Sequence, residues 1–163
     1  MIIRVARSEE APALSQLAMA SKASWGYPAE QMTGWSDALT ITPASVVATP
    51  TFVAETGSQG NEIAGFYQLG PARTPWALEH LWVHPDWMRR GIGCELVTHA
   101  SAYAHRQGVD RLEIDADPHA ELFYLACGAT RVGSIPAPIP GEPGRLRPQL
   151  LLLYPGTGVS RAF

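Results

Sequence analysis

A short stretch near the middle of the chain combines residue types that bind phosphate. Residues 88–93 read Met-Arg-Arg-Gly-Ile-Gly, so two arginines and two glycines stand within five residues. Glycine allows a sharp turn and a close approach to a ligand, and the first N–H groups of a following helix have no partner within that helix. Together with the helix dipole and the charges of Arg89 and Arg90, these donors favour a phosphate or a pyrophosphate.

Two regular elements must hold this turn. Upstream, residues 76–83 are rich in aromatic and apolar types, which predicts a buried strand that Pro85 ends. Downstream, apolar residues recur at helical spacing from Ile92, and Gly108 is suited to end that helix. A strand predicted at 111–116 is then reached through a helical crossover, so we expect it to run parallel to the strand at 76–83.

The rest of the pattern predicts a mixed sheet, antiparallel in its first half, and hence an α+β (mixed α/β) fold. A hairpin is expected around a turn at 56–61, and the proline-rich segment 135–144 should be irregular because proline lacks an N–H donor. Thr42-Pro43 is expected to mark a turn, and the tail from Pro155 to be loosely held. Further strands are predicted at 2–6, 51–55, 62–69, 129–134 and 150–154, and further helices at 8–21, 29–39 and 118–127.

Composition narrows the class of protein. The chain has 163 residues, 46% of them hydrophobic, and a net charge of −3, which indicates one globular core and argues against a general nucleic-acid binder. The amino-terminal sequence does not resemble a signal peptide, and no apolar run is long enough to span a membrane. Cys94 and Cys127 suggest neither a disulfide scaffold nor a metal site, so we expect two buried thiols and a cytoplasmic location.

The glycines allow one other phosphate-binding interpretation. A dinucleotide-binding fingerprint needs Gly-x-Gly-x-x-Gly near the amino end of a strand–helix unit and an acidic residue about twenty positions later. The third glycine is missing here, and so is the Gly-Lys-Ser/Thr of a P-loop. Neither of these nucleotide-binding motifs therefore explains residues 88–93.

The stretch instead resembles the fingerprint of the GNAT superfamily of acyl-CoA-dependent N-acetyltransferases, and the resemblance covers most of the chain. That fingerprint is Gln/Arg-x-x-Gly-x-Gly/Ala, often preceded by Val-x-Pro. The chain has Val-His-Pro at 83–85 and then residues 88–93, with Met88 in the Gln/Arg position. That first position contributes largely through its backbone, so Met88 is a small departure.

A second family element is an Asn seven residues before a Tyr, with a Gly four residues after that Tyr. Asp117, Tyr124 and Gly128 hold those places. Asp117 is the larger departure, because a carboxylate accepts hydrogen bonds from pantetheine amides but cannot donate as Asn does.

The resemblance implies a GNAT-like fold over residues 1–163 as one domain, with a splayed mixed sheet of about six or seven strands and helices on both faces. Residues 1–50 would supply a strand and the acceptor-side helices, and 51–128 the acyl-CoA-binding core. Residues 129–154 would form a carboxy-terminal strand pair, followed by a tail at 155–163.

The resemblance also implies acetyl-CoA as cofactor and CoA as product, bound between the strands at 76–83 and 111–116. The pyrophosphate would lie on the amides from Arg89 to Cys94, and the pantetheine would add to the sheet along Trp82 and Val83. The cofactor-binding residues so implied are Leu81, Trp82, Val83, Met88, Arg89, Arg90, Gly91, Ile92, Gly93, Cys94, Asp117, Ala120, Phe123 and Tyr124.

Acetylation of an amine by a thioester involves two proton transfers, one from the amine and one to the leaving thiolate. An amine with a pKa of about 10.4 is neutral in only about one molecule in ~10³ at pH 7, so a base helps the attack and an acid helps the thiolate leave. By family position Tyr124 is the acid. Strand alternation would send Glu79 and His80 to opposite faces, so only one of them can face the amine. The resemblance favours Glu79 as the base, because related enzymes often use a Glu on this strand, frequently through water; His80 or a water chain is the alternative. Cys94 has no identifiable base beside it, which favours direct transfer over an acetyl-cysteine route.

The acceptor is less defined. Trp25, Tyr27 and Trp35 lie where the family builds one wall of its acceptor pocket, with His80 also near it, although packing between helices or a dimer mate would explain the aromatic residues equally well. Arg145 and Arg147 follow the proline-rich segment and are candidates for the opposite rim.

The predicted function is an N-acetyltransferase that moves an acetyl group to a primary amine of a small molecule or peptide in a ternary complex. The alternatives are a non-catalytic acyl-CoA sensor and a protein-lysine acetylase. No metal, nucleic-acid partner or membrane is expected, and the protein would be a monomer or a homodimer.

Overall fold

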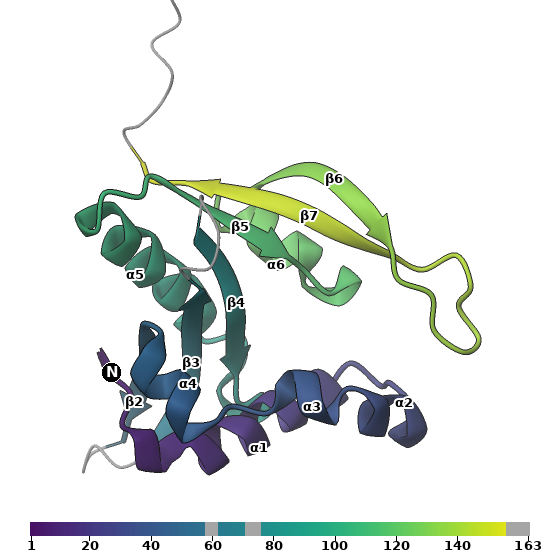
Figure 1. Cartoon of the computed structure of the whole chain (residues 1–163), viewed down its shortest axis with the longest axis horizontal. Helices are drawn as coiled ribbons and strands as arrows, with labels where there is room; N and C mark the ends of the chain where they lie inside the picture. The colour runs from purple at the N-terminus through teal and green to yellow at the C-terminus, as the bar shows by residue number, and fades with distance from the viewer. Residues whose placement is uncertain (58–61, 71–75, 156–163) are drawn as a thin grey trace, which may run out of the picture.

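The computed structural model describes residues 1–57, 62–70 and 76–155 (Figure 1). Most of the predicted hairpin turn and the predicted tail after Pro155 therefore lie outside the described residues.

The described residues form one mixed sheet of seven strands in the order β1-β2-β3-β4-β5-β7-β6 (Figure 1). Neighbours are antiparallel except β4 and β5, which run parallel as predicted. The predicted mixed fold is thus confirmed. The strands are β1 (Ile2–Val5), β2 (Thr51–Thr56), β3 (Glu62–Gly70), β4 (Trp76–Val83), β5 (Arg111–Asp115), β6 (Thr130–Pro136) and β7 (Leu146–Leu153).

The helices largely follow the predicted positions. The segment predicted as one helix at 29–39 forms two short helices. The helices are α1 (Ala11–Ala23), α2 (Ala29–Gly34), α3 (Ser36–Leu39), α4 (Pro43–Ala48), α5 (Ile92–Arg106) and α6 (Glu121–Ala126), and 3-10 turns occupy Ser8–Glu10, Pro85–Trp87 and Pro118–Ala120.

Helix α4 corrects the turn predicted at Thr42-Pro43. The Thr42 hydroxyl accepts a hydrogen bond from the Ser45 amide at 3.0 Å, and Pro43 occupies the first helical position. A capping threonine followed by proline is a helix-start signal, because the cap satisfies a free N–H and proline has none to lose.

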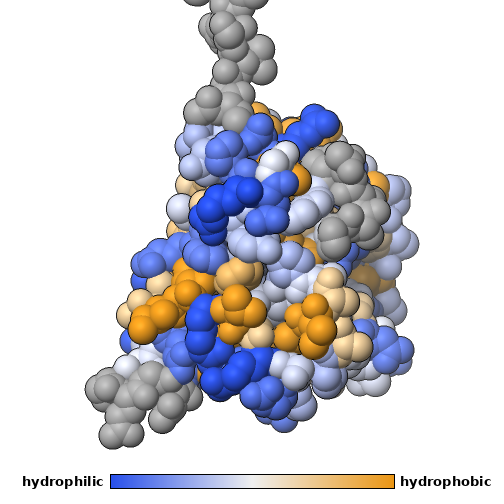
Figure 2. All heavy atoms as spheres, turned by 60° about the vertical axis from the view of Figure 1, so that its left-hand side comes forward, coloured by the Kyte–Doolittle hydropathy of each residue, from blue (hydrophilic) through white to orange (hydrophobic). Residues whose placement is uncertain are grey.

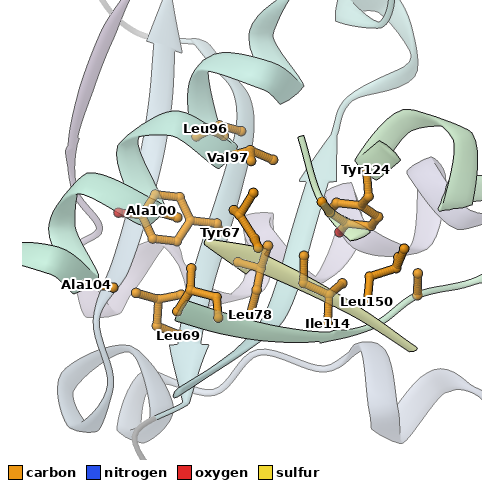
Figure 3. Packing of buried hydrophobic residues seen from close by; sticks show 14 of the residues in the cluster. Tyr67, Leu69, Leu78, Leu96, Val97, Ala100, Ala104, Ile114, Tyr124 and Leu150 are labelled. Carbon is orange, nitrogen blue, oxygen red and sulfur yellow. The ribbon is translucent and has the colours of Figure 1, made fainter. Parts of the chain in front are cut away.

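Two hydrophobic cores lie on opposite faces of the sheet. Tyr67 and Leu69 of β3 pack against Leu96 and Ala100 of α5 in the first core (Figure 3). The neighbouring β3 residue Phe66 belongs to the second core, with side chains from α1 to α4. Strand alternation thus sends successive β3 side chains to different helical layers, as expected for helices on both faces of a sheet.

The two halves of the sheet separate between β4 and β5. Among the described residues, these strands pair only at Trp76 with Leu112 and at Ala77 with Glu113. Strand β5 continues along β7, to which every residue from Arg111 to Asp115 is paired. Beyond Ala77 the β4 edge that faces β5 is therefore open, and the sheet is splayed as predicted.

The outer strand β1 carries exposed apolar side chains, with Ile2 and Val5 68% and 64% exposed. Figure 2 brings forward the side that lies at the left of Figure 1, and apolar side chains gather there in a band between hydrophilic ones. Across residues 1–57, 62–70 and 76–155, every helix is too short or too polar to cross a lipid bilayer.

Gly65 allows β3, β4 and α5 to approach closely. A Cβ at this position would lie 2.8 Å from the Trp82 carbonyl oxygen and 3.0 Å from Leu96 Cδ1. We expect Gly65→Ala to lower the free energy of unfolding by about 1–3 kcal/mol, because backbone and packed side chain must both shift. Urea denaturation would measure this.

Gly34→Ala is the matched control for Gly65→Ala. A Cβ on Gly34, at the end of α2, would meet no atom within 4 Å, and alanine favours helix, so its stability should be unchanged or slightly raised. Equal stability of the two variants would contradict the packing argument.

Candidate active site

A cavity of about 200 Å³ lies where β4 and β5 diverge. It is lined by both strands, by α6 on one face of the sheet and by residues of α1 and α3 on the other. It thus connects the two faces at the only parallel strand pair that the described residues form. The sequence-predicted site residues that line it are Trp25, Trp35, Glu79, His80, Leu81, Trp82, Asp117, Ala120, Tyr124, Arg145 and Arg147.

The strict alternation expected for Glu79 and His80 is wrong. Gln68 is opposite His80 and Leu69 is opposite Leu78, so Glu79 is an extra residue in β4. Such a bulge locally breaks alternation and redirects side chains, often beside active sites. Both Glu79 and His80 consequently line the cavity. The exposed Glu79 carboxylate lies over Gly70, where any Cβ would overlap it.

His80 is a poor candidate for the base in this geometry. The Trp82 indole Nε1 donates a hydrogen bond to His80 Nδ1 at 3.2 Å. Because an indole only donates, Nδ1 must accept, and the proton of the neutral ring resides on Nε2. Burial lowers the pKa of His80, which keeps the ring neutral. Its remaining nitrogen is then a donor, whereas the Glu79 carboxylate can accept a proton.

Tyr124 lies at the α6 side of the cavity, with its ring close to Ile114 and Leu150 (Figure 3). The side chain is 7% exposed, and burial raises its pKa, with nearby Cys127 adding to the effect. Within the described part of the chain its hydroxyl has no hydrogen-bond partner. A neutral hydroxyl facing a cavity is able to donate a proton to a bound molecule.

The predicted phosphate-binding turn has the backbone that such a site needs. Arg89 and Gly91 adopt left-handed conformations, with φ of 60° and 83°, and α5 begins at Ile92. The amides of Ile92 and the next two residues point out of the first helical turn without helical acceptors. Arg89 and Arg90 are exposed, and a Cβ on Gly91 would meet nothing within 4 Å. The turn therefore offers positive charge, free amide donors and open space to an anionic group.

The other predicted cofactor residues lie outside the cavity. Val83, at the end of β4, leads from the cavity into the turn, and Met88 is half-buried within that turn. Phe123 of α6 packs at the start of α5, where a Cβ on Gly93 would lie 2.8 Å from its Cε2 atom. Glycine at 93 therefore lets α5 and α6 meet beside the turn.

Cys94 corrects the prediction of two buried thiols, because it is exposed on the first turn of α5. Its Sγ lies 2.6 Å from Cys127 Sγ. Burial, followed by the contact with Cys94, raises the pKa of Cys127 to about 12. Neither cysteine lines the cavity, so an acetyl-cysteine route has no support in the described residues.

The Asp117 carboxylate is the centre of a buried charged cluster. It accepts hydrogen bonds from Lys22 Nζ at 2.9 Å, Arg145 Nη2 at 3.1 Å and Tyr27 Oη at 3.0 Å, as well as from the His119 amide. Burial alone would raise the pKa of Asp117, but the hydrogen bonds and the charge of Lys22 outweigh burial and lower it. The carboxylate is thus held in its ionised form.

Lys22 is the site residue that the sequence reasoning missed. Its Nζ lies 4.0 Å from the centre of the Trp35 ring, and Trp25 and Tyr27 are also within cation–π range. Its helical spacing could have indicated that it is buried, because Lys22 follows Leu14 and Ala18 on the same buried face of α1. The predicted aromatic wall therefore surrounds a lysine, although Tyr27 contacts Asp117 without lining the cavity.

Residues 48–128 match the family model described as an acetyltransferase (GNAT) domain. The chain carries a GNAT acetyltransferase domain. It is accordingly an acyltransferase, and the family resemblance seen in residues 88–93 is confirmed.

Solved GNAT structures share the fold over nearly the whole chain. A GCN5-related N-acetyltransferase from Rhodopseudomonas palustris has 22% identity and a TM-score of 0.75, covering 93% of this chain and 94% of that one. The PaiA N-acetyltransferase from Thermoplasma acidophilum, in complex with coenzyme A, has 16% identity and a TM-score of 0.73, covering 94% and 98%. The ribosomal-protein-S18-alanine N-acetyltransferase from Escherichia coli has 17% identity and a TM-score of 0.69, covering 99% of each chain.

Asp117 departs from the GNAT pattern, and its contacts supply the reason. An Asn at this place would leave Lys22 and Arg145 without a buried counter-charge. We expect Asp117→Asn to lower the free energy of unfolding by about 3–5 kcal/mol in urea denaturation. The double variant with Lys22→Met should recover part of the loss, and Asp86→Asn, in which an exposed carboxylate changes, is the control.

The same variant has an expected pH dependence. The pKa of Asp117 is lower in the folded state than its ordinary value. The stabilisation is therefore complete above that ordinary value and is lost as the pH falls through the lowered folded pKa. The stability difference between wild type and Asp117→Asn should shrink in strong acid, and a difference independent of pH would contradict this role.

Proposed function

We propose that the protein transfers an acetyl group from acetyl-CoA to a primary amine of a small molecule or peptide. The observation that carries this proposal is the cavity in the β4–β5 split, where Glu79 and Tyr124 line one space that is open to both helical layers. The two cysteines are free thiols, which is consistent with the proposed cytoplasmic location.

Three features of the chain would hold acetyl-CoA. The exposed Arg89 and Arg90 and the free amides at the start of α5 suit its pyrophosphate. The open β4 edge near Trp82 and Val83 has backbone groups that an extended pantetheine can pair with, as an added strand would. When bound, acetyl-CoA supplies a thioester whose acyl group is open to attack by an amine.

In the proposed reaction, the amine loses one proton and the leaving sulfur gains one. The amine nitrogen forms a bond to the acyl carbon, and the bond from that carbon to sulfur breaks. Glu79, directly or through water, takes the proton that the amine loses. Tyr124, whose buried hydroxyl is neutral and carries a proton, gives that proton to the sulfur as the bond breaks.

Binding and turnover must be measured separately to test this function. Acetyl-CoA and CoA should both raise the melting temperature, and acetyl-CoA should release free thiol in the presence of some member of a panel of amines, polyamines, amino acids and peptides. Stabilisation without thiol release across the panel would favour the non-catalytic sensor. Absence of stabilisation at millimolar CoA would overturn both functions. Turnover only with protein substrates would favour the lysine acetylase.

Tyr124→Phe removes the proposed acid while keeping the buried ring. We expect kcat to fall by about 10²–10⁴-fold, because general acid catalysis contributes that much, while the KM for acetyl-CoA stays nearly constant. Steady-state thiol release would measure both. Tyr103→Phe on α5 is the control, since Tyr103 packs on Phe52 and Trp76 away from the cavity. An unchanged kcat in Tyr124→Phe would remove the assignment.

A further inference from the structure

The buried cluster at Asp117 has more positive than negative charge. Lys22 and Arg145 are each only 9% exposed, and both contact the same carboxylate oxygen, Oδ2, at 2.9 and 3.1 Å. One carboxylate thus faces two cations. Burying a charge without a partner is costly, so an additional anion would stabilise this arrangement.

Arg145 also has a donor that the protein leaves unused. Its Nη1 donates to the Ala137 carbonyl oxygen, and its Nη2 donates to Asp117 and to Tyr27 Oη. Its Nε is buried and has no partner among the described residues. Leaving a buried donor unpaired costs free energy, and Arg145 lines the cavity in which an acceptor for that donor would bind.

Among the described residues, none of the other charged side chains that line the cavity pairs with Lys22 or Arg145. Arg147 donates to the Asp115 carbonyl oxygen, and the exposed Asp115 carboxylate accepts from Gln149. Glu79 lies on β4, two residues past the last residue that pairs with β5. Lys22 Nζ is 6.0 Å from the centre of the Trp82 ring, and Trp82 lies farther along β4 than Glu79 does. The cavity therefore has a carboxylate at the beginning of the split and two cations farther along it.

We propose that the acceptor is a free amino acid, whose carboxylate pairs with Lys22 and Arg145 while its amine faces Glu79. This inference rests on the proposed acetyl transfer. Trp25 and Trp35 would contact the amino-acid side chain, which favours an apolar or aromatic one. The cavity of about 200 Å³ is smaller than the roughly 300–1,000 Å³ of drug-sized sites, as suits so small an acceptor.

Matched substrates test the carboxylate directly. Each standard amino acid is compared with its amide in the thiol-release assay with acetyl-CoA. For the best apolar or aromatic amino acid we expect kcat/KM to be at least about 100-fold higher than for its amide, because a charged carboxylate pairs with two buried cations. The amide has the more easily deprotonated amine, so intrinsic reactivity alone would give the opposite order.

Variants assign this preference to the cluster. Lys22→Met and Arg145→Met should each lower the ratio of acid to amide kcat/KM by about tenfold or more, chiefly through loss of activity on the acid. Arg131→Met is the control, because Arg131 pairs with Glu121 at the surface, and it should keep the wild-type ratio. An unchanged ratio in folded Lys22→Met and Arg145→Met would overturn the assignment.

A binding measurement on the wild type is independent of turnover and of how the variants fold. In the presence of CoA, N-acetyl-L-phenylalanine should raise the melting temperature more than its amide does, and N-acetyl-L-leucine should behave likewise. Equal shifts for acids and amides, or equal thiol release from both, would overturn the amino-acid inference while leaving acetyl transfer intact. Absence of any stabilisation by acetyl-CoA or CoA would instead overturn the proposed function.

Discussion

The divergence of β4 and β5 is the constraint on which the rest of the structure depends. The strands share two residue pairs, after which β5 follows β7 and β4 follows β3. Each half of the sheet keeps its own antiparallel hydrogen bonding, so the split costs little pairing elsewhere. The open β4 edge is the exception, because its backbone groups need partners. A ligand that pairs as a strand would satisfy them.

The two helical layers supply side chains that line the space between β4 and β5. On one face, α5 and α6 meet through the close contact of Gly93 with Phe123, which brings the turn and Tyr124 to the same side of the sheet. On the other face, the cavity is lined by Lys22 of α1 and Leu39 of α3, and by Trp25 and Trp35, which lie just outside these helices. An acyl donor and an acceptor are thus able to approach from opposite faces and meet between the strands.

The charged cluster joins parts of the chain that are distant in sequence. Lys22 comes from α1, Asp117 follows β5, and Arg145 precedes β7. This cluster stabilises the fold only while Asp117 is ionised, and it places two cations against one carboxylate beside the cavity. The same residues therefore serve the fold and the proposed recognition of a carboxylate, which gives a physical reason for an aspartate where the family has Asn.

Local features were predictable from the sequence alone. The turn at 88–93, the start of α5 and the positive φ of Gly108 and Gly128 follow from glycine freedom and from hydrophobic period, which depend on residues close in the chain. The short helix predicted at 118–127, which contains Tyr124, is likewise present as α6 after β5.

Tertiary structure alone decided the features that depend on register and on distant partners. The bulge at Glu79 arises from the pairing of β4 with β3, and no local pattern marks it. The burial of Lys22 and Arg145 around Asp117 requires segments that meet only after folding. Sequence thus determined the backbone of the glycine-rich turn at 88–93 and the fold class, whereas long-range contacts decided the charge and shape of the cavity between β4 and β5.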